Sequence, residues 1–144
     1  MKNFDVIELC NAGILDITSN DLEAEDAYIV YKFKKQLRKL YSEISENEKE
    51  LLKQAEIENP VEFDINYKKA LESKDENEIA KYQGKLFRFS ELKKVMMSEE
   101  AELNIERKIS YKSWHTLQKE NSDKKALTGY NEELLENILW SSEM

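Results

Sequence analysis

The sequence predicts a mainly α-helical protein, a long antiparallel two-helix hairpin with a small helical head and room for one or two short strands. Three observations predict it. Charged residues make up 36% of the 144 residues, with three glycines and one proline, a composition that favours long helices over strands and tight turns. Apolar residues recur in heptad spacing from Val30 to Leu51. A second helical pattern runs from Ile79 to Met96.

The first long helix is expected at about residues 20–57. Its apolar seam, interrupted at Asn47, consists of Val30, Phe33, Leu37, Leu40, Ile44 and Leu51. Asn20 and Glu23 form a capping-box signal at its start. The helix should end before Pro60, because the residue before a proline is disfavoured in helical conformation. The seam is typical of an intramolecular hairpin, with an intermolecular coiled coil as the alternative.

Two apolar segments beside this helix cannot be assigned from periodicity alone. The first half of residues 4–17 forms a short helix or a strand, since the run is too short for periodicity to decide, and the second half, from Ile14 to Thr18, is expected to be extended. In the connector, residues 58–74, an alternation favours a short extended piece, while residues 67–71 leave room for one or two helical turns. The alternating residues are Val61, Phe63, Ile65 and Tyr67.

The second long helix is expected at residues 76–101, after a capping-box signal at Asp75 and Glu78. Its seam contains Ile79, Tyr82, Leu86, Phe89 and Met96. The start of the first helix and the end of the second are apolar on more than one face, so antiparallel packing would bring both into one packed head. We therefore predict a single domain, 1–144. Its stalk comprises about 22–57 and 76–101, and its head comprises 1–20, 24–37, 86–97 and 103–140.

Three further elements are expected in the last forty or so residues. Alternation over residues 103–111 predicts a strand or an extended strap. Residues 111–121 predict a short helix that presents Trp114 and Leu117. A closing helix, capped by Thr128 or Asn131, carries Leu134, Leu135, Ile138, Leu139 and Trp140. Its apolar stripe is expected to cover side chains outside the hairpin seam, namely Tyr28, Tyr31, Phe87 and Val95.

The order of these pieces resembles a family of small phage and prophage proteins, domain of unknown function 1617. The likeness lies mostly in the ending, which runs from Leu127-Thr128-Gly129-Tyr130 through Leu134-Leu135 to Trp140. It extends to the segments 24–40, 92–103 and 105–117. This chain has Gly129-Tyr130 where the family pattern leads us to expect a proline after the threonine. The resemblance implies a phage-encoded cytoplasmic protein and supplies no catalytic residue.

The charge of −8 and pI near 4.9 argue against a general binder of nucleic acids or anionic membranes, which needs a basic surface. An acidic surface mainly keeps a protein soluble. Cys10 is the only cysteine, so no intramolecular disulfide can form. The sequence contains no apolar run of signal-peptide length at its start and no span fit for a bilayer. We expect a cytoplasmic protein.

The sequence indicates no catalytic, cofactor or metal site, and we expect no enzyme. His115 is the only histidine, and neither it nor Cys10 lies in a nucleophile or zinc motif. Carboxylates such as Glu99, Glu100 and Glu102 are expected to cluster by chance at this charge density. Three scattered glycines form no phosphate-binding loop.

One run reverses the overall sign of charge, and it consists of Lys32, Lys34, Lys35, Arg38 and Lys39. These residues occupy outer heptad positions, which favours a solvated face, with contact to an acidic partner or nucleic acid as the alternative. The candidate partner-contact residues are Tyr28, Tyr31, Lys35, Arg38, Trp114 and Trp140.

The predicted function is non-enzymatic protein–protein interaction, with a host or phage protein or by self-association, without nucleic acid or membrane. One alternative is an acidic mimic of DNA that inhibits a host nuclease or defence complex. Another is an assembly protein that oligomerises through its helical hairpin. Mimicry needs ordered rows of carboxylates, whereas a scaffold shows mixed charges and an apolar patch.

Overall fold

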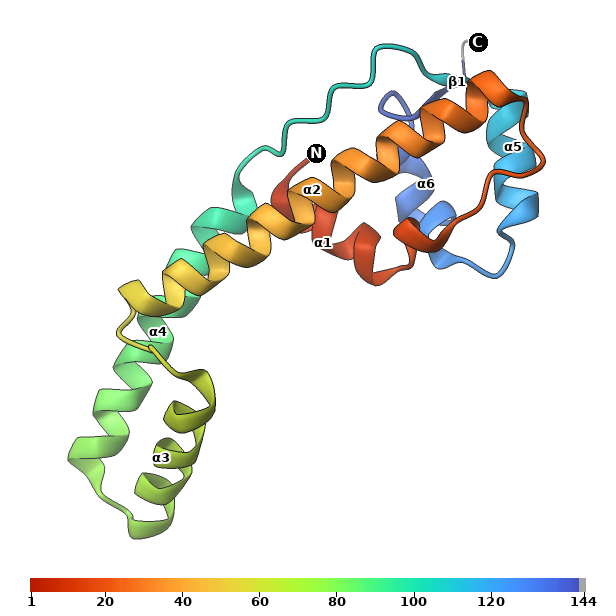
Figure 1. Ribbon diagram of the computed structural model, residues 1–144. Helices are drawn as coiled ribbons and strands as arrows, with labels where there is room; N and C mark the ends of the chain where they lie inside the picture. Colours follow the sequence, from red (N-terminus) through yellow and green to blue (C-terminus); the bar gives the residue numbers. More distant parts are fainter. Residues whose placement is uncertain (143–144) are drawn as a thin grey trace. The chain divides into compact units, whose positions relative to one another are not determined.

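The computed structural model describes residues 1–142, which are mainly helical, as the composition predicts (Figure 1). The helices are α1 (Asn3–Asn11), α2 (Ala24–Gln54), α3 (Pro60–Ser73), α4 (Glu76–Ser98), α5 (Tyr111–Glu120) and α6 (Tyr130–Leu135). Two 3-10 turns, η1 (Ile14–Asp16) and η2 (Lys125–Leu127), and two short strands, β1 (Ile109–Ser110) and β2 (Trp140–Ser141), complete this part.

The residues form two compact units by their contacts. Unit 1 contains Met1–Ser42 together with the chain from Glu100 on, and unit 2 contains Glu43–Glu99. Residues 86–97, expected in the head, fall in unit 2. The long helix α2 contributes its first half to unit 1 and its last turns to unit 2.

The predicted antiparallel helix pair is present in unit 2. The Lys93 Nζ lies 3.4 Å from the Glu48 carboxylate, and the Lys85 Nζ donates to the Glu56 carbonyl at 3.2 Å. Residue numbers therefore fall along α4 as they rise along the end of α2, so the two run in opposite directions. Both helices are slightly shorter than expected, since α2 begins at Ala24 and ends at Gln54, and α4 ends at Ser98.

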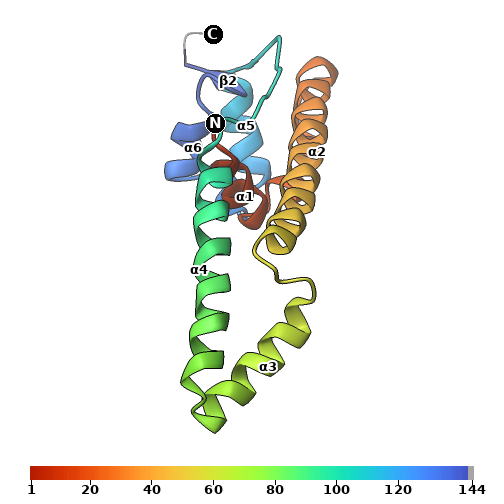
Figure 2. The same cartoon turned by 90° about the vertical axis from the view of Figure 1, so that its left-hand side faces the viewer.

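The extended piece predicted in the connector is wrong, because Pro60–Ser73 forms the helix α3 (Figure 2). The Asn59 side chain accepts from the Glu62 N–H at 3.1 Å, and Pro60 occupies the first turn, where its missing N–H costs nothing. Phe63 and Tyr67 share one face of α3 and pack on Tyr82 of α4, with ring centroids 5.1 and 5.8 Å away. Asp75 caps α4 as predicted, accepting from the Glu78 N–H at 3.3 Å.

Unit 1 has a dense apolar core. The seam residues Val30, Phe33 and Leu37 of α2 are fully buried. They are joined by apolar side chains of α1, η1, β1, α5 and the C-terminal segment that are buried as well, namely Val6, Leu9, Ile14, Ile109, Trp114, Leu117, Leu127, Leu135, Leu139 and Trp140. Within segment 4–17, the first half forms the helix α1, and the extended conformation predicted from Ile14 on is wrong at Ile14–Asp16, which forms the 3-10 turn η1.

The chain enters α2 through contacts with the end of α5. The capping box predicted at Asn20 is wrong, because the Glu120 carboxylate, about 100 residues away, accepts from the N–H groups of Asn20 and Asp21. Desolvation raises the pKa of the Glu120 carboxyl, but hydrogen bonds from Thr18, Asp21 and Asn20 outweigh it and hold the pKa below its usual value. Beside it, the buried Asn121 side chain accepts from the Thr18 N–H at 2.8 Å and donates to its carbonyl at 2.7 Å.

Of the two predictions for residues 103–111, the extended strap is closer to the structure. The chain from Ala101 to Lys108 contains no strand, and only β1 that follows it pairs, in parallel, with β2. The side chain of Gln36 ties the strap to α2 through two 2.8 Å hydrogen bonds with the backbone N–H and carbonyl of Asn104.

The closing helix is much shorter than predicted. It ends at Leu135, and Asn137 adopts a left-handed conformation (φ 68°) that turns the chain back so that Trp140 enters β2. The segment still contributes to the core, since Leu135, Leu139 and Trp140 are buried. It does not cover the four side chains outside the hairpin seam, and that prediction is wrong. Tyr28, Tyr31, Phe87 and Val95 are all more than half exposed.

Candidate protein-contact surface

Over residues 28–39, α2 presents one face to the core of unit 1 and the opposite face to solvent. The outward residues are spaced three and four apart, which places them on one side of the helix. Tyr28 is 58% exposed and Tyr31 is 52% exposed. We call this surface the Tyr–Lys face and define it as Tyr28, Tyr31, Lys32, Lys35, Arg38 and Lys39, all of which are exposed. It holds four of the six residues that the sequence marks as candidates for partner contact.

The two tyrosines form a stacked pair, with ring centroids 6.0 Å apart and an interplanar angle of 18°. The Lys32 Nζ lies 5.2 Å from the Tyr28 ring centroid, within range of a cation–π interaction. The two rings and the Lys32 ammonium together form an amphipathic surface, which is apolar over the rings and positively charged at the ammonium.

The remaining cations of the Tyr–Lys face are not neutralised by the protein. Within residues 1–142, the side chains of Lys35, Arg38 and Lys39 make no ion pair or hydrogen bond. The neighbouring Lys34 differs, because its Nζ donates to the Ile17 carbonyl at 2.8 Å and so belongs to the fold. The face therefore carries four positive charges on a protein of net charge −8, three of them unpaired.

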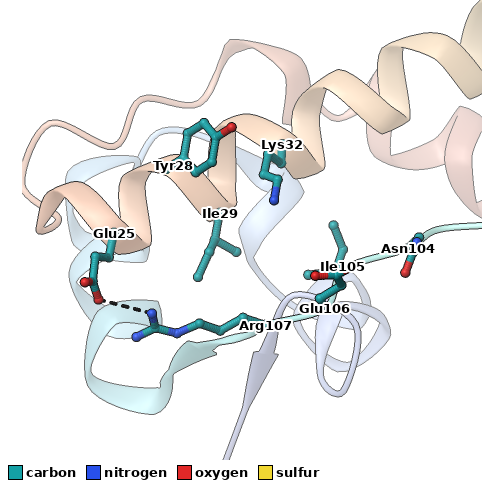
Figure 3. A pocket seen from close by; sticks show the side chains of 8 residues that line it. All are labelled: Glu25, Tyr28, Ile29, Lys32, Asn104, Ile105, Glu106 and Arg107. Carbon is teal, nitrogen blue, oxygen red and sulfur yellow. Dashed lines mark hydrogen bonds and ion pairs between the residues drawn. The ribbon is translucent and has the colours of Figure 1, made fainter.

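A groove of about 480 Å³ opens beside the tyrosines, between α2 and the strap (Figure 3). It is lined by Glu25, Tyr28, Ile29, Lys32, Asn104, Ile105, Glu106 and Arg107. Arg107 and Glu25 form an ion pair of 3.1 Å across it, which Figure 3 draws as a dashed line. Together with the Gln36–Asn104 pair, this ion pair fixes the strap to α2 at two points.

The groove has the size of a site for a small molecule or a partner's anchor side chain. Its apolar part comes from Tyr28, Ile29 and Ile105, and its rim carries charges of both signs. None of its lining residues is a cysteine, serine or histidine.

Trp114 and Trp140 are not available as contact residues, which corrects the sequence-based expectation. Their indole rings stack on each other, with centroids 5.2 Å apart and an interplanar angle of 9°. Trp114 is fully buried and Trp140 nearly so. The physical reason is the turn at Asn137, which brings Trp140 against α5 through the pairing of β1 and β2.

The residues considered for catalysis lie apart from this surface. His115 lies on α5, with its ring edge-on to Tyr111 at 4.2 Å. Cys10 is half-buried, and this burial raises the pKa of its thiol, which disfavours the reactive thiolate. Across residues 1–142, no three His, Cys, Asp or Glu side chains lie close enough to hold a metal ion. No helix in that range is long and apolar enough to cross a membrane.

The sequence does not predict that the strap, residues 101–108, lines one side of the groove. Asn104, Glu106 and Arg107 occur in an alternating segment, and alternation indicates an extended chain without saying what it lies against. Gln36 lies one turn from Lys32 and Lys39 in a charged helix, and nothing nearby marks it as the residue that holds the strap.

Comparison with models of protein families, with curated proteins and with solved structures gives no match. The resemblance to the phage and prophage family therefore stays a prediction.

Proposed function

We propose that this protein is a non-enzymatic interaction protein that binds another protein through the Tyr–Lys face of α2. The observation that carries the proposal is the stacked Tyr28–Tyr31 pair, more than half exposed and continuous with three unpaired cations. Aromatic residues and arginine are enriched in protein interfaces and supply most of their binding energy. The adjacent groove offers a pocket for one anchor side chain of the partner.

The charge distribution favours this function over mimicry of a polyanion. A mimic needs ordered rows of carboxylates, whereas several acids of unit 2 lie beside basic residues and pair with them. Glu46 pairs with Lys49 at 3.1 Å and Asp64 with Lys68 at 2.9 Å. The Tyr–Lys face itself has the sign opposite to that of a DNA mimic.

The setting of this function is part of the proposal and rests on the sequence. The resemblance to the phage and prophage family implies a phage-encoded protein that acts in the cytoplasm of its host. A host or phage protein is then the partner, or a second copy of the chain.

The test is affinity capture from a lysate of the cells that carry the gene, with wild-type protein and a Tyr28→Ser/Tyr31→Ser variant as baits. A differently tagged second copy of the chain is included so that self-capture is scored. Tyr130→Ser is the matched control, because Tyr130 is 68% exposed in the same unit but lies on α6. We expect the double variant to lose a partner that the control retains. If all three baits capture the same proteins, the Tyr–Lys face is not a contact surface.

A further inference from the structure

The Tyr–Lys face lies in a part of α2 that contains no acidic residue. The 16 residues 27–42 include five basic residues and neither Asp nor Glu, although acids outnumber bases by 30 to 22 in the whole chain. The last turns of the same helix differ, because Lys49 pairs there with Glu46 at 3.1 Å and Lys53 with Glu50 at 3.3 Å. Within one helix, acids that could pair with the lysines are present in the last turns and absent along the face.

The cations of the face repel one another. Lys35 lies three residues from both Lys32 and Arg38, and it lies four residues from Lys39. Like charges at these spacings are neighbours on the helix surface and destabilise the helix. Within residues 1–142, no carboxylate pairs with Lys35, Arg38 or Lys39 to reduce this repulsion. A bound anionic group would reduce it, so the face favours a partner that carries negative charge.

The groove beside the face adds an apolar requirement. Ile29 of α2 and Ile105 of the strap point into it from opposite sides, and the Lys32 side chain extends toward the same space (Figure 3). The Lys32 ammonium contacts the Tyr28 ring but makes no ion pair within residues 1–142. Apolar walls suit a large aliphatic or aromatic side chain, and the ammonium suits a carboxylate close to it.

We propose that the partner of the Tyr–Lys face is an acidic segment of another protein. One large apolar side chain of this segment enters the groove, and several of its carboxylates pair with Lys32, Lys35, Arg38 and Lys39. Lys32 and Lys39 are seven residues apart, about 10 Å along the helix. A partner helix with acids one turn apart matches this length. The inference rests on the proposed function and names the chemistry of the partner for the same surface.

An acidic protein segment fits the face better than a nucleic acid does. Nucleic acids are held by many phosphate contacts, and the face offers three unpaired cations and Lys32. A phosphate backbone that continued past the rings would also meet Glu106, an exposed carboxylate without an ion pair in the described chain. A protein segment places its apolar side chain there instead. Single-stranded nucleic acid, which combines stacking with charge contacts, is the competing occupant in the test.

The test is a selection of displayed random peptides on the immobilised full chain. Peptides of about twelve residues are used, because as helices they match the length of the run from Tyr28 to Lys39. The strongest binder is then synthesised with a fluorescent label, and its affinity is measured by fluorescence anisotropy at several salt concentrations. Labelled single-stranded oligothymidine is measured in the same way.

The variant Lys35→Glu/Arg38→Glu reverses the charge at the centre of the face. We expect the selected peptides to be rich in Asp and Glu around one large apolar residue, and to bind this variant at least about tenfold more weakly than the wild type. Binding to the wild type should weaken as salt rises. Lys112→Glu/Lys119→Glu is the matched control, since it changes net charge equally at exposed α5 lysines without ion pairs in residues 1–142. It should bind as the wild type does.

A second variant tests the groove separately from the charges. Ile105→Gln replaces an apolar wall of the groove by a polar side chain. Peptides selected on this variant should remain acidic but lose the preference for a large apolar residue. Circular dichroism verifies that every variant is folded.

Three outcomes would overturn the inference. The first is a set of selected peptides without enrichment in acids, or acidic peptides that bind Lys35→Glu/Arg38→Glu as well as the wild type. The second is oligothymidine binding that this variant loses while no acidic peptide binds, which assigns the face to nucleic acid. The third is self-association of the wild type in analytical ultracentrifugation that the same variant loses, which assigns the face to a second copy.

Failure of this inference can be distinguished from failure of the proposed function. Selected peptides that lack acids but lose binding to Tyr28→Ser/Tyr31→Ser would overturn the acidic partner alone. The Tyr–Lys face would then still be a protein-contact surface. Peptides that bind this double variant and Lys35→Glu/Arg38→Glu as well as the wild type would overturn both.

Discussion

Units 1 and 2 differ in how completely they bury their apolar side chains. Unit 1 buries two tryptophans, Phe33 and a set of leucines and isoleucines almost completely. Unit 2 buries far less, namely Ile44, Ala55, Ile57, Ala70 and Met96. Several of its large apolar side chains are exposed, namely Val61, Ile65, Leu71, Leu86, Phe87 and Val95. Unit 1 therefore has a well-buried core, whereas the three helical segments of unit 2 leave part of their apolar surface exposed to solvent.

The polar contacts of unit 2 do not make up this difference. Most of its ion pairs are exposed ones within single helices, such as Lys49–Glu46, where both side chains are about two-thirds or more exposed. Pairs of this kind contribute at most about 0.5 kcal/mol each. The Lys93–Glu48 pair between α4 and α2 is the exception among the described residues of the unit. The aromatic cluster of Phe63, Tyr67 and Tyr82 is its main tertiary contact. Exposed apolar patches on such a unit indicate an interaction surface.

The largest expected difference between the units is in the cost of removing a core aromatic ring. Trp114→Ala removes a fully buried ring and its stacking contact with Trp140. It should lower the free energy of unfolding by about 3–5 kcal/mol. Phe63→Ala removes a half-buried ring from unit 2 and should cost less than about 2 kcal/mol. Urea unfolding followed by circular dichroism measures both. Equal costs would mean that unit 2 is packed as densely as unit 1.

Local periodicity predicts most of the buried seam of α2, whereas a local signal with two meanings is misleading. Of the predicted seam residues, Val30, Phe33, Leu37 and Ile44 are buried, and Leu40 and Leu51 are half-buried. Asn59-Pro60 was interpreted only as the end of one helix, although the same pair starts α3, because an Asn cap followed by Pro is also an initiation signal.

Other features depend on contacts far apart in the sequence. Leu134 to Trp140 has helical spacing, but Asn137 takes up a left-handed conformation and Trp140 stacks on Trp114 instead. The outward tyrosines and cations of the candidate surface could be predicted, since they lie off the seam of one helix. The groove could not, because Gln36 and Asn104, which hold the strap, are 68 residues apart.

The next-largest expected difference between the units is in the rate of amide hydrogen exchange. Amides of α3 and α4 should exchange through local opening at low free energy, well before those of α2 between Ile29 and Leu37, because they have fewer buried contacts. Mass spectrometry of deuterium uptake at low protein concentration measures this. Protection of α3 equal to that of residues 29–37 would contradict the comparison.

A smaller effect is expected from Glu120, which holds the chain before α2 in unit 1. Its pKa is lowered in the folded state, so its stabilising contribution is present above the unfolded pKa of about 4.3 and is lost as pH falls through the lower folded value. Glu120→Gln should cost less than about 1 kcal/mol at neutral pH, because the carboxylate lies at the surface. Thermal melts at several pH values should show the difference narrowing below about pH 4. A difference that does not depend on pH would mean that the charge of Glu120 plays no part.

The smallest expected effect is a gain of stability in unit 2. Gly84 lies inside α4, and a Cβ placed there meets nothing within 4 Å. Gly84→Ala should therefore stabilise the helix by up to about 1 kcal/mol, because alanine has the higher helix propensity and narrows the unfolded ensemble. Gly129→Ala in unit 1 is the matched control. It also meets no neighbour, but its φ of 59° disfavours a side chain, so the same substitution should destabilise. Hydrogen exchange in α4 should slow in the first variant while unit 1 is unchanged. If Gly84→Ala instead loosens α4, close packing of another molecule against Gly84 is the physical cause to test, by repeating the measurement across protein concentration.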